Sequence, residues 1–342
     1  MREKRISIVV PSYNVEDTLG QTLDSILNTQ YVYDVEVIIV NDGSKDNTEK
    51  VAQKYVRDFP GSVRLINKEN GGHGSTINIG IEEASGEYFK VIDGDDWVDR
   101  NGWNEFLRKL RSIDSDIVVT NYYEVNDGTK QKTEVVLGNK NLYGKNKKFN
   151  EIYEVCDIPM HGLTIRTSIL KGNKITIDEN CFYVDMEFIL LPIPFVDTAV
   201  FLEDFVYMYR VAQENQSISS KGWMMHRNDH VKVVKRLLSE LNSDACKNSK
   251  KENFLYFEKR VLRSLIARFF LGFKFEKQII SEYLLEQREL DKFVKKNNKY
   301  LYDKCNQNFF VSAIRRSNYN TQLYLAFRGC WKIQRLIRRK TY

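Results

Sequence analysis

Three aspartates gather directly after one apolar segment of the sequence. Asp93, Asp95 and Asp96 follow the strand-like residues 87–92, with Gly94 after the first aspartate. Side chains two positions apart in an extended chain point to the same side, so Asp93 and Asp95 can converge on one ligand. Two carboxylates about 6 Å apart repel each other by roughly 3 kcal/mol at an effective dielectric constant near 20, and a cation would offset that cost. The segment therefore predicts a site for Mg²⁺ or Mn²⁺, with an acidic turn that caps the next helix as the alternative.

Two further polar loops follow apolar segments. Pro11–Asn14 comes after residues 6–10, and Asp42 follows residues 35–40. The Asp42 carboxylate could accept hydrogen bonds from a nucleobase or a ribose, or it could cap the helix that begins near Asp46.

The elements that must position these loops alternate between strands and helices. The predicted strands are 6–10, 35–40, 63–66 and 87–92, and the predicted helices are 15–30, 46–55 and 75–84. Continuous β-branched runs separated by helices are typical of an α/β fold, here Rossmann-like, with a mostly parallel sheet and helices on both faces. Such sheets bind ligands at the carboxyl ends of their strands, so we expect the three polar loops to form one site.

The second half of the chain changes character. Residues 121–210 are less regular, and after Gly222 the segments 231–241, 254–273 and 278–296 have helical spacing. We therefore predict a domain of residues 1–220, composed of the halves 1–120 and 121–220, and a helical C-terminal region of residues 221–342.

The composition predicts a globular protein, and we expect it to stay in the cytoplasm. Hydrophobic residues make up 42% of the 342 positions and charged residues 29%. No apolar run approaches the roughly 18 residues of a membrane-spanning helix, and the apolar run near the N-terminus is too short for a secretory signal. The five scattered cysteines have no CxxC spacing, so we expect neither disulfides nor a zinc site.

The net charge of +6 comes from the last part of the chain. Residues 315–342 contain eight Lys or Arg residues and no acid, which leaves 44 basic against 46 acidic residues elsewhere. If residues 323–340 are helical, one stripe is apolar (Ala326, Cys330, Ile333, Ile337) and another is basic (Arg328, Lys332, Arg335, Arg339). A basic amphipathic helix can lie on an anionic membrane, or it can pack on the protein with its basic face in water. We expect no nucleic-acid partner, because no nucleic-acid module accompanies the charge.

The ordered set of motifs resembles the family 2 glycosyltransferases of GT-A fold. The resemblance covers residues 4–120 and extends through Tyr207–Arg210 and residues 216–219 to about residue 220. Its motifs are Val10–Asn14, Glu36–Ser44 with Asp46–Thr48, Asn70–Gly72, Asn78–Gly80, Ser85–Tyr88 and Asp93–Trp97.

The resemblance implies a role for each matching position of the nucleotide-binding half. Asp42 would read the base, usually uracil, Asp93 would lie towards the ribose, and Asp95 would bind the metal at the diphosphate. The nucleotide pocket would be lined by Pro11, Ser12, Tyr13 and Asn14. One departure concerns Ile77, which stands where the family often has arginine; His73 is then a candidate substitute for the missing contact.

The resemblance also implies a catalytic base in the second half. Asp185 matches that base, although Val184 replaces the acid that usually precedes it, and Glu187 is the substitute candidate. An acid that interacts with the helix dipole is the structural alternative. His226 is a weaker candidate for the metal shell, and His161 could border the acceptor pocket or be structural. Arg210 could contact a phosphate or form a surface ion pair.

The expected activity is transfer of a sugar from a nucleotide-sugar, most simply a UDP-sugar, with inversion of the anomeric centre. The acceptor would be a glycan or a lipid-linked saccharide in the synthesis of a surface polysaccharide, which would place the enzyme at the inner face of the membrane. The alternatives are a nucleotidyltransferase and an inactive nucleotide-sugar-binding module. The first would need a glycine-rich basic loop after the first strand, and Pro11–Asn14 is not such a loop.

Overall fold

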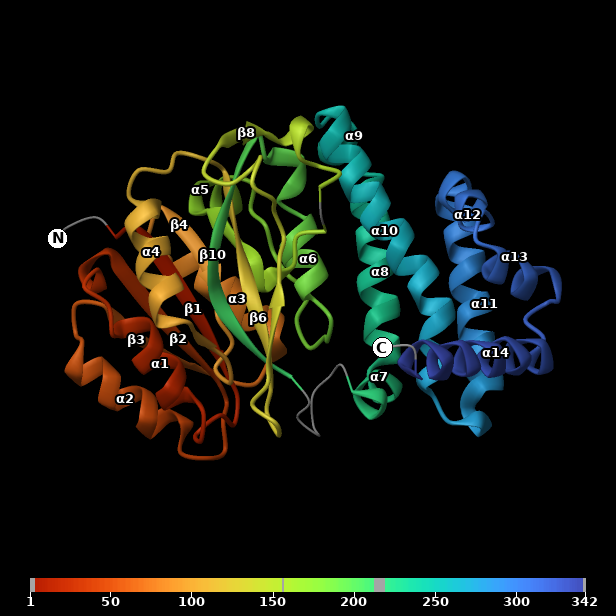
Figure 1. The fold of residues 1–342 in the computed structure, drawn as a ribbon, viewed down its shortest axis with the longest axis horizontal. Coiled ribbons are helices and arrows are strands. Elements are labelled where there is room, and N and C mark those ends of the chain that lie inside the picture. Colours follow the sequence, from red (N-terminus) through yellow and green to blue (C-terminus); the bar gives the residue numbers. More distant parts are fainter. Residues whose placement is uncertain (1–3, 156, 212–218, 341–342) are drawn as a thin grey trace. The chain divides into compact units, whose positions relative to one another are not determined.

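The computed structural model describes residues 4–155, 157–211 and 219–340, with the side chains of Ser220 and residues 332–340 excluded (Figure 1). The chain divides into two compact units. The first consists of Met1–Gln216 and Asn248–Tyr256, and the second consists of Ser217–Lys247 and Phe257–Tyr342.

The first half of the first unit is built on four parallel strands. They lie in the order β3-β2-β1-β4, with bounds β1 Ile6–Ser12, β2 Val35–Asp42, β3 Val63–Lys68 and β4 Tyr88–Val91. Every residue of β1, β2 and β4 is buried, which explains why these segments are apolar without alternation. The predicted α/β sheet is confirmed.

Three helices connect these strands and cover both faces of the sheet. They are α1 Leu19–Leu27, α2 Thr48–Asp58 and α3 Gly72–Glu83. The chain moves from β1 to β2 to β3 and then returns past β1 to β4, so right-handed crossovers place α1 and α2 on one face and α3 on the other. The strand order reverses at β1, and sheets of this kind bind ligands outside the carboxyl ends of the strands at such a point, here β1 and β4.

The second half of the first unit extends the same sheet with mixed strands. The sheet continues β4-β9-β6-β10-β5, where β9 is antiparallel to β4 and β6, and β10 is parallel to β6. The bounds are β5 Trp97–Val98, β6 Ile117–Asn126, β7 Lys132–Val135, β8 Asn146–Lys148, β9 Leu163–Arg166 and β10 Thr198–Val211. The helices of this half are α4 Arg100–Leu110, α5 Thr167–Gly172 and α6 Asp185–Leu190. The long strand β10 brings residues near 207 back to the loop after β4.

The second unit is helical, as the sequence predicts. Its helices are α7 Ser220–Met225, α8 Arg227–Leu241, α9 Asp244–Lys247, α10 Lys251–Leu271, α11 Ile280–Asn297, α12 Lys299–Cys305, α13 Phe309–Arg316 and α14 Thr321–Lys340. The first six residues of α10 belong to the first unit. None of the helices described combines the length and the apolar character needed to cross a bilayer.

The basic tail packs on the second unit over its first three turns. The Tyr324 hydroxyl is buried and donates to the carbonyl of Phe269 at 2.7 Å, and the Trp331 ring lies 5.6 Å from that of Phe273. Arg315 is paired with Asp291 at 2.6 Å. This part of the tail therefore follows the alternative in which the helix packs on the protein. The predicted stripe residues Lys332, Ile333, Arg335, Ile337 and Arg339 lie outside the described side chains.

Candidate functional site

The loop after β4 begins with an aspartate that is paired with a histidine of α3. Asp93 Oδ1 lies 2.8 Å from Nε2 of His73, which is in the first turn of α3. The backbone N–H of Asp93 donates to the Tyr207 hydroxyl at 3.2 Å. Burial alone would raise the pKa of Asp93, but His73 and the other donors nearby lower it, so this side chain is a carboxylate at neutral pH.

The third aspartate of the loop anchors it to β10. Asp96 is buried, and its two oxygens accept hydrogen bonds from the Arg210 backbone N–H and the Tyr207 hydroxyl, each at 2.7 Å. The Arg210 guanidinium donates to the Asp95 carbonyl at 2.7 Å and pairs with Asp127 at 2.8 Å. Burial and the neighbouring carboxylates raise the pKa of Asp96 well above its ordinary value. Arg210 is thus a buried structural cation that fixes the loop, which sequence reasoning did not anticipate.

Asp95 remains half-buried in the middle of this loop. Burial, and then the charge of Asp93, raise its pKa to about 6. A bound cation would favour the ionised form of this carboxyl and would reverse the shift.

Asp185 shares the space around these aspartates. Burial would lower the pKa of His73, but Asp93, Asp185 and Asp95 together raise it. Burial and the same three carboxylates, with Asp96, raise the pKa of Tyr209. The charges of the β4 loop acids and of Asp185 in α6 therefore affect the same two side chains, His73 and Tyr209.

Glu187 has a different position from Asp185, although both lie in the first turn of α6. The Glu187 side chain is fully buried, and its Oε2 accepts the backbone N–H of Asp178 at 2.7 Å. Asp185 is only partly buried. Glu187 thus holds the segment that precedes α6, and Asp185 is the more accessible of the two candidates for a base.

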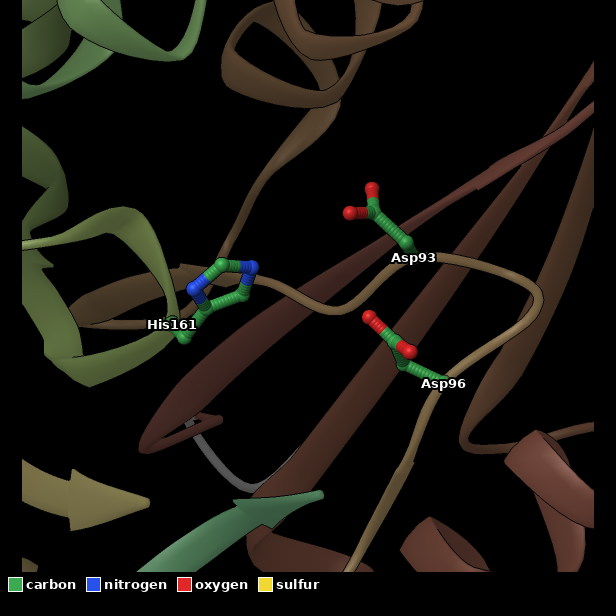
Figure 2. A group of neighbouring side chains, drawn as sticks. All are labelled: Asp93, Asp96 and His161. Atoms are coloured by element: carbon green, nitrogen blue, oxygen red, sulfur yellow. The ribbon is translucent and has the colours of Figure 1, made fainter. Parts of the chain in front are cut away.

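Three side chains could hold a metal ion together. Ligand atoms of Asp93, Asp96 and His161 all lie within 4.8 Å of one another, and Figure 2 shows the imidazole opposite the two carboxylates of the loop. Burial lowers the pKa of His161 to about 4, so its ring is neutral and able to bind a metal at neutral pH. Two carboxylates and an imidazole fit a divalent cation. The predicted ligand His226 belongs to the second unit, where its Nδ1 lies 3.4 Å from Asp229 Oδ2.

A buried lysine holds His161 in place. Lys90 in β4 is fully buried and donates to the carbonyls of His161 and Leu163 at 2.8 and 3.1 Å. Burial lowers its pKa to about 7. The His161 ring is stacked on Tyr209 at 4.0 Å. Sequence reasoning missed Lys90, although a charged residue in an otherwise apolar strand was a signal.

The Asp42 carboxylate organises the loop between β3 and α3. It is buried and accepts hydrogen bonds from the Lys68 ammonium at 2.6 Å and from the backbone N–H groups of Gly71 and Gly72, each at 2.9 Å. Gly72 has a φ of 79°, which favours glycine. The predicted contact of Asp42 with a base remains a prediction.

The predicted nucleotide loop lies at the end of β1. Pro11 and Ser12 are buried, Tyr13 is exposed over 50% of its surface, and Asn14 has a φ of 52°. Asn14 accepts the backbone N–H of Lys45 at 2.8 Å. The Gly94 N–H donates to the Pro11 carbonyl at 3.0 Å, so two of the predicted loops are joined directly.

The family is evident from residues 7–172, which match the model of glycosyl transferase family 2. The minor teichoic acid biosynthesis protein GgaB of Bacillus subtilis is 27% identical over 305 residues, which cover 84% of this chain and 31% of that protein. The chain spans 23%, 34% and 31% of the lengths of three curated relatives that it matches.

Solved structures share the fold. TarS 1–349 of S. aureus, in complex with UDP-GlcNAc, superposes with a TM-score of 0.64 at 18% identity and covers 95% of this chain and 92% of that chain. The mannosyltransferase PcManGT of Pyrobaculum calidifontis, in complex with GDP-Man and Mn²⁺, has a TM-score of 0.52 at 13% identity and covers 96% and 87%. Residues 7–172 therefore form a segment of glycosyltransferase family 2, and the chain has a GT-A fold followed by a helical C-terminal region.

Proposed function

We propose that this chain transfers a sugar from a nucleotide-sugar donor to an acceptor hydroxyl, with inversion of the anomeric centre. The observation that carries the proposal is that the acids of the β4 loop and Asp185 of α6 act on the same two neighbours, His73 and Tyr209. Acids for the donor side and an acid for the acceptor side thus lie near the same two side chains, at the edge of the sheet where α/β folds bind ligands.

Asp185 is the proposed general base. Its carboxylate takes the proton from the acceptor hydroxyl while that oxygen attacks the anomeric carbon on the face opposite the nucleotide. The bond from that carbon to the diphosphate oxygen breaks in the same step, so one displacement inverts the configuration. Its partial burial keeps Asp185 accessible, in contrast to Glu187.

Mn²⁺ or Mg²⁺ is the proposed cofactor, because family 2 enzymes commonly use a divalent metal and the donor set fits one. Asp93 and His161, which belong to the group of neighbouring ligand atoms, are proposed ligands. Asp95 is proposed as a further ligand because the sequence resemblance implies it, and His226 is the alternative nitrogen ligand that the sequence suggested. The metal would neutralise charge on the departing diphosphate. Asp96 would contribute mainly by keeping the loop in position, because both of its oxygens already accept hydrogen bonds within the protein.

A UDP-sugar is the proposed donor, with the base bound near Asp42 and by the loop of Pro11, Ser12, Tyr13 and Asn14. The UDP-GlcNAc complex of TarS and the teichoic acid relatives support this donor class and an acceptor in surface-polysaccharide synthesis. The acceptor would be a glycan or a lipid-linked saccharide, which an enzyme at an anionic membrane surface would reach directly.

The test is a screen of nucleotide-sugars for Mn²⁺-dependent hydrolysis and transfer. We expect a UDP-sugar to be turned over, and we expect Asp185→Asn to bind it normally while transfer falls by a factor of about 10² to 10⁴. Asp58→Asn, an exposed acid at the end of α2, is the matched control. Normal transfer by Asp185→Asn would show that Asp185 is not the general base. Donor binding without any turnover would favour the inactive binding module.

A further inference from the structure

An exposed aromatic side chain stands directly before the helix that carries the proposed base. Phe182 is exposed over 43% of its surface, and its ring centroid lies 6.4 Å from that of Tyr183. Three positions separate Phe182 from Asp185 in the first turn of α6. Among the described aromatic side chains of the first unit, only Tyr13, Tyr33 and Phe182 are exposed, so an exposed ring at this place is unusual.

The segment that carries Phe182 is fixed to α3 and to α6. The N–H of Asn180 donates to the Gly71 carbonyl at 2.6 Å, and Asn78 exchanges hydrogen bonds with the backbone of Ile177 at 2.7 and 2.9 Å. Glu187 holds the N–H of Asp178 from the other side. The exposed ring is therefore mounted on a tethered backbone.

Two residues close to Phe182 have positive φ angles, which residues other than glycine rarely adopt. Asn180 has a φ of 49°, and Tyr183 has a φ of 65°. A bulky aromatic residue at positive φ is a genuine outlier, and such strain persists where the surrounding structure imposes it, often at ligand-binding positions. The two positive-φ residues flank Cys181 and Phe182, so the chain turns on both sides of the exposed ring.

We propose that Phe182, with Tyr183 beside it, is a platform for a pyranose ring of the acceptor. This inference rests on the proposed transferase function and deepens it by naming the acceptor class. The C–H face of a sugar ring is apolar and stacks on an aromatic face, whereas its hydroxyls need polar partners. Because Phe182 precedes Asp185 by three residues, a sugar ring seated on Phe182 would lie close to the proposed base. An open-chain polyol has the hydroxyls but no such face, so the platform selects a cyclic sugar acceptor.

The experiment compares ring and open-chain acceptors with matched variants. Binding of methyl glycosides of hexoses and N-acetylhexosamines, and of ribitol, is measured by saturation-transfer NMR in the presence of UDP, and transfer is measured with the UDP-sugar that the protein hydrolyses. The variants are Phe182→Ala, Phe182→Trp and the control Tyr33→Ala, whose ring is exposed over 73% in the short helix before β2. Thermal unfolding checks that the variants fold.

We expect Phe182→Ala to raise the KM for a methyl glycoside at least tenfold while donor hydrolysis stays within twofold, and we expect Phe182→Trp to retain binding. Tyr33→Ala should match the unaltered chain. The platform is refuted if Phe182→Ala behaves like Tyr33→Ala, if ribitol binds as well as the glycosides, or if donor hydrolysis falls together with transfer. Absence of any turnover with normal glycoside binding would instead refute the proposed function alone.

Discussion

The three aspartates of the loop after β4 are compensated in different ways. Asp93 has His73 at 2.8 Å, and Asp96 accepts two hydrogen bonds from β10. For Asp95, burial and then the charge of Asp93 outweigh a backbone hydrogen bond and the charges of Arg210 and His73, and they raise its pKa to about 6. A cation placed next to Asp95 would relieve this cost, and this is the physical reason for placing the metal there.

The affinity for Mn²⁺ should therefore depend on pH. Because the folded-state pKa of Asp95 is raised, its carboxyl is protonated below about pH 6, and a metal must displace that proton. We expect affinity to fall by up to about tenfold per pH unit below pH 6 and to level off above pH 7, as measured by titration calorimetry. Asp95→Asn should weaken binding and flatten this slope. A constant affinity of the unaltered chain from pH 5 to pH 7 would contradict the assignment.

The nitrogen ligand can be identified with two histidine variants. His161 lies within 4.8 Å of Asp93 and Asp96, whereas His226 belongs to the other unit. We expect His161→Ala to weaken Mn²⁺ binding about tenfold or more and His226→Ala to leave it unchanged. The opposite result would show that His226, the ligand that the sequence suggested, binds the metal and that His161 does not.

At the residue scale the sequence predicted Asp93, Asp95 and Asp185 because these acids belong to local motifs. It did not predict the roles of Lys90 and His161, because they depend on contacts between segments about 70 residues apart. Local spacing carries no information about such pairs.

The packing of α3 against the segment before α6 links two elements of the proposed site. A Cβ on Gly74 would lie 2.0 Å from the carbonyl oxygen of Asp178, so Gly74→Ala must push that segment away from α3. We expect this substitution to destabilise the fold by about 1 to 3 kcal/mol and to reduce transfer, because Asp185 follows the displaced segment. Chemical unfolding and the transfer assay measure the two effects. Gly172→Ala, where a Cβ meets open space, is the control, and equal behaviour of the two variants would contradict the expected strain.

The sequence predicted the four parallel strands of the nucleotide-binding half and the three helices between them to within a few residues, because buried parallel strands have strong apolar runs. It missed β10 in the less regular region 121–210. That strand contains a register shift near residues 202–207 and several polar positions, so its apolar pattern is broken.

The tail offers an element-scale test of membrane docking. Removal of residues 315–342 would also delete buried Tyr324 and the Arg315–Asp291 pair, so loss of function would be ambiguous. A chain ending at Trp331 retains these contacts and loses five basic residues. We expect it to fold normally and to lose co-sedimentation with anionic vesicles, because each basic residue near such a surface contributes about 1 kcal/mol. Unchanged co-sedimentation would refute docking through the last eleven residues.

At the scale of the whole molecule, the first unit is not one continuous stretch of chain. Asn253 in α10 is buried and donates to the carbonyls of Ile193 and Val196 at 2.6 and 2.7 Å, and the Tyr256 hydroxyl accepts the N–H of Ile158 at 2.9 Å. The first turns of α10 therefore complete the core of the catalytic unit. The predicted domain boundary near residue 220 could not include them, because the helical spacing of α10 continues without a break.

A chain ending at residue 216 should consequently be less stable than one ending at residue 256. Asn253→Ala in the full chain leaves two buried carbonyls without their donor, and we expect it to cost about 2 to 4 kcal/mol of unfolding free energy. Urea titration measures both effects. Equal stability of the two shortened chains would show that the segment 248–256 is dispensable.

The Asp42 carboxylate accepts hydrogen bonds from Gly71, Gly72 and Lys68, all of them within the protein. We expect these hydrogen bonds to hold the loop between β3 and α3 in one arrangement, so that little ordering entropy is lost there when a nucleotide binds. Binding of a nucleotide to the protein should then follow a single exponential, and its observed rate constant should rise linearly with nucleotide concentration. The same fixed arrangement should limit the choice of nucleotide. A nucleotide whose base has a different shape should bind poorly, because the loop cannot rearrange to fit it.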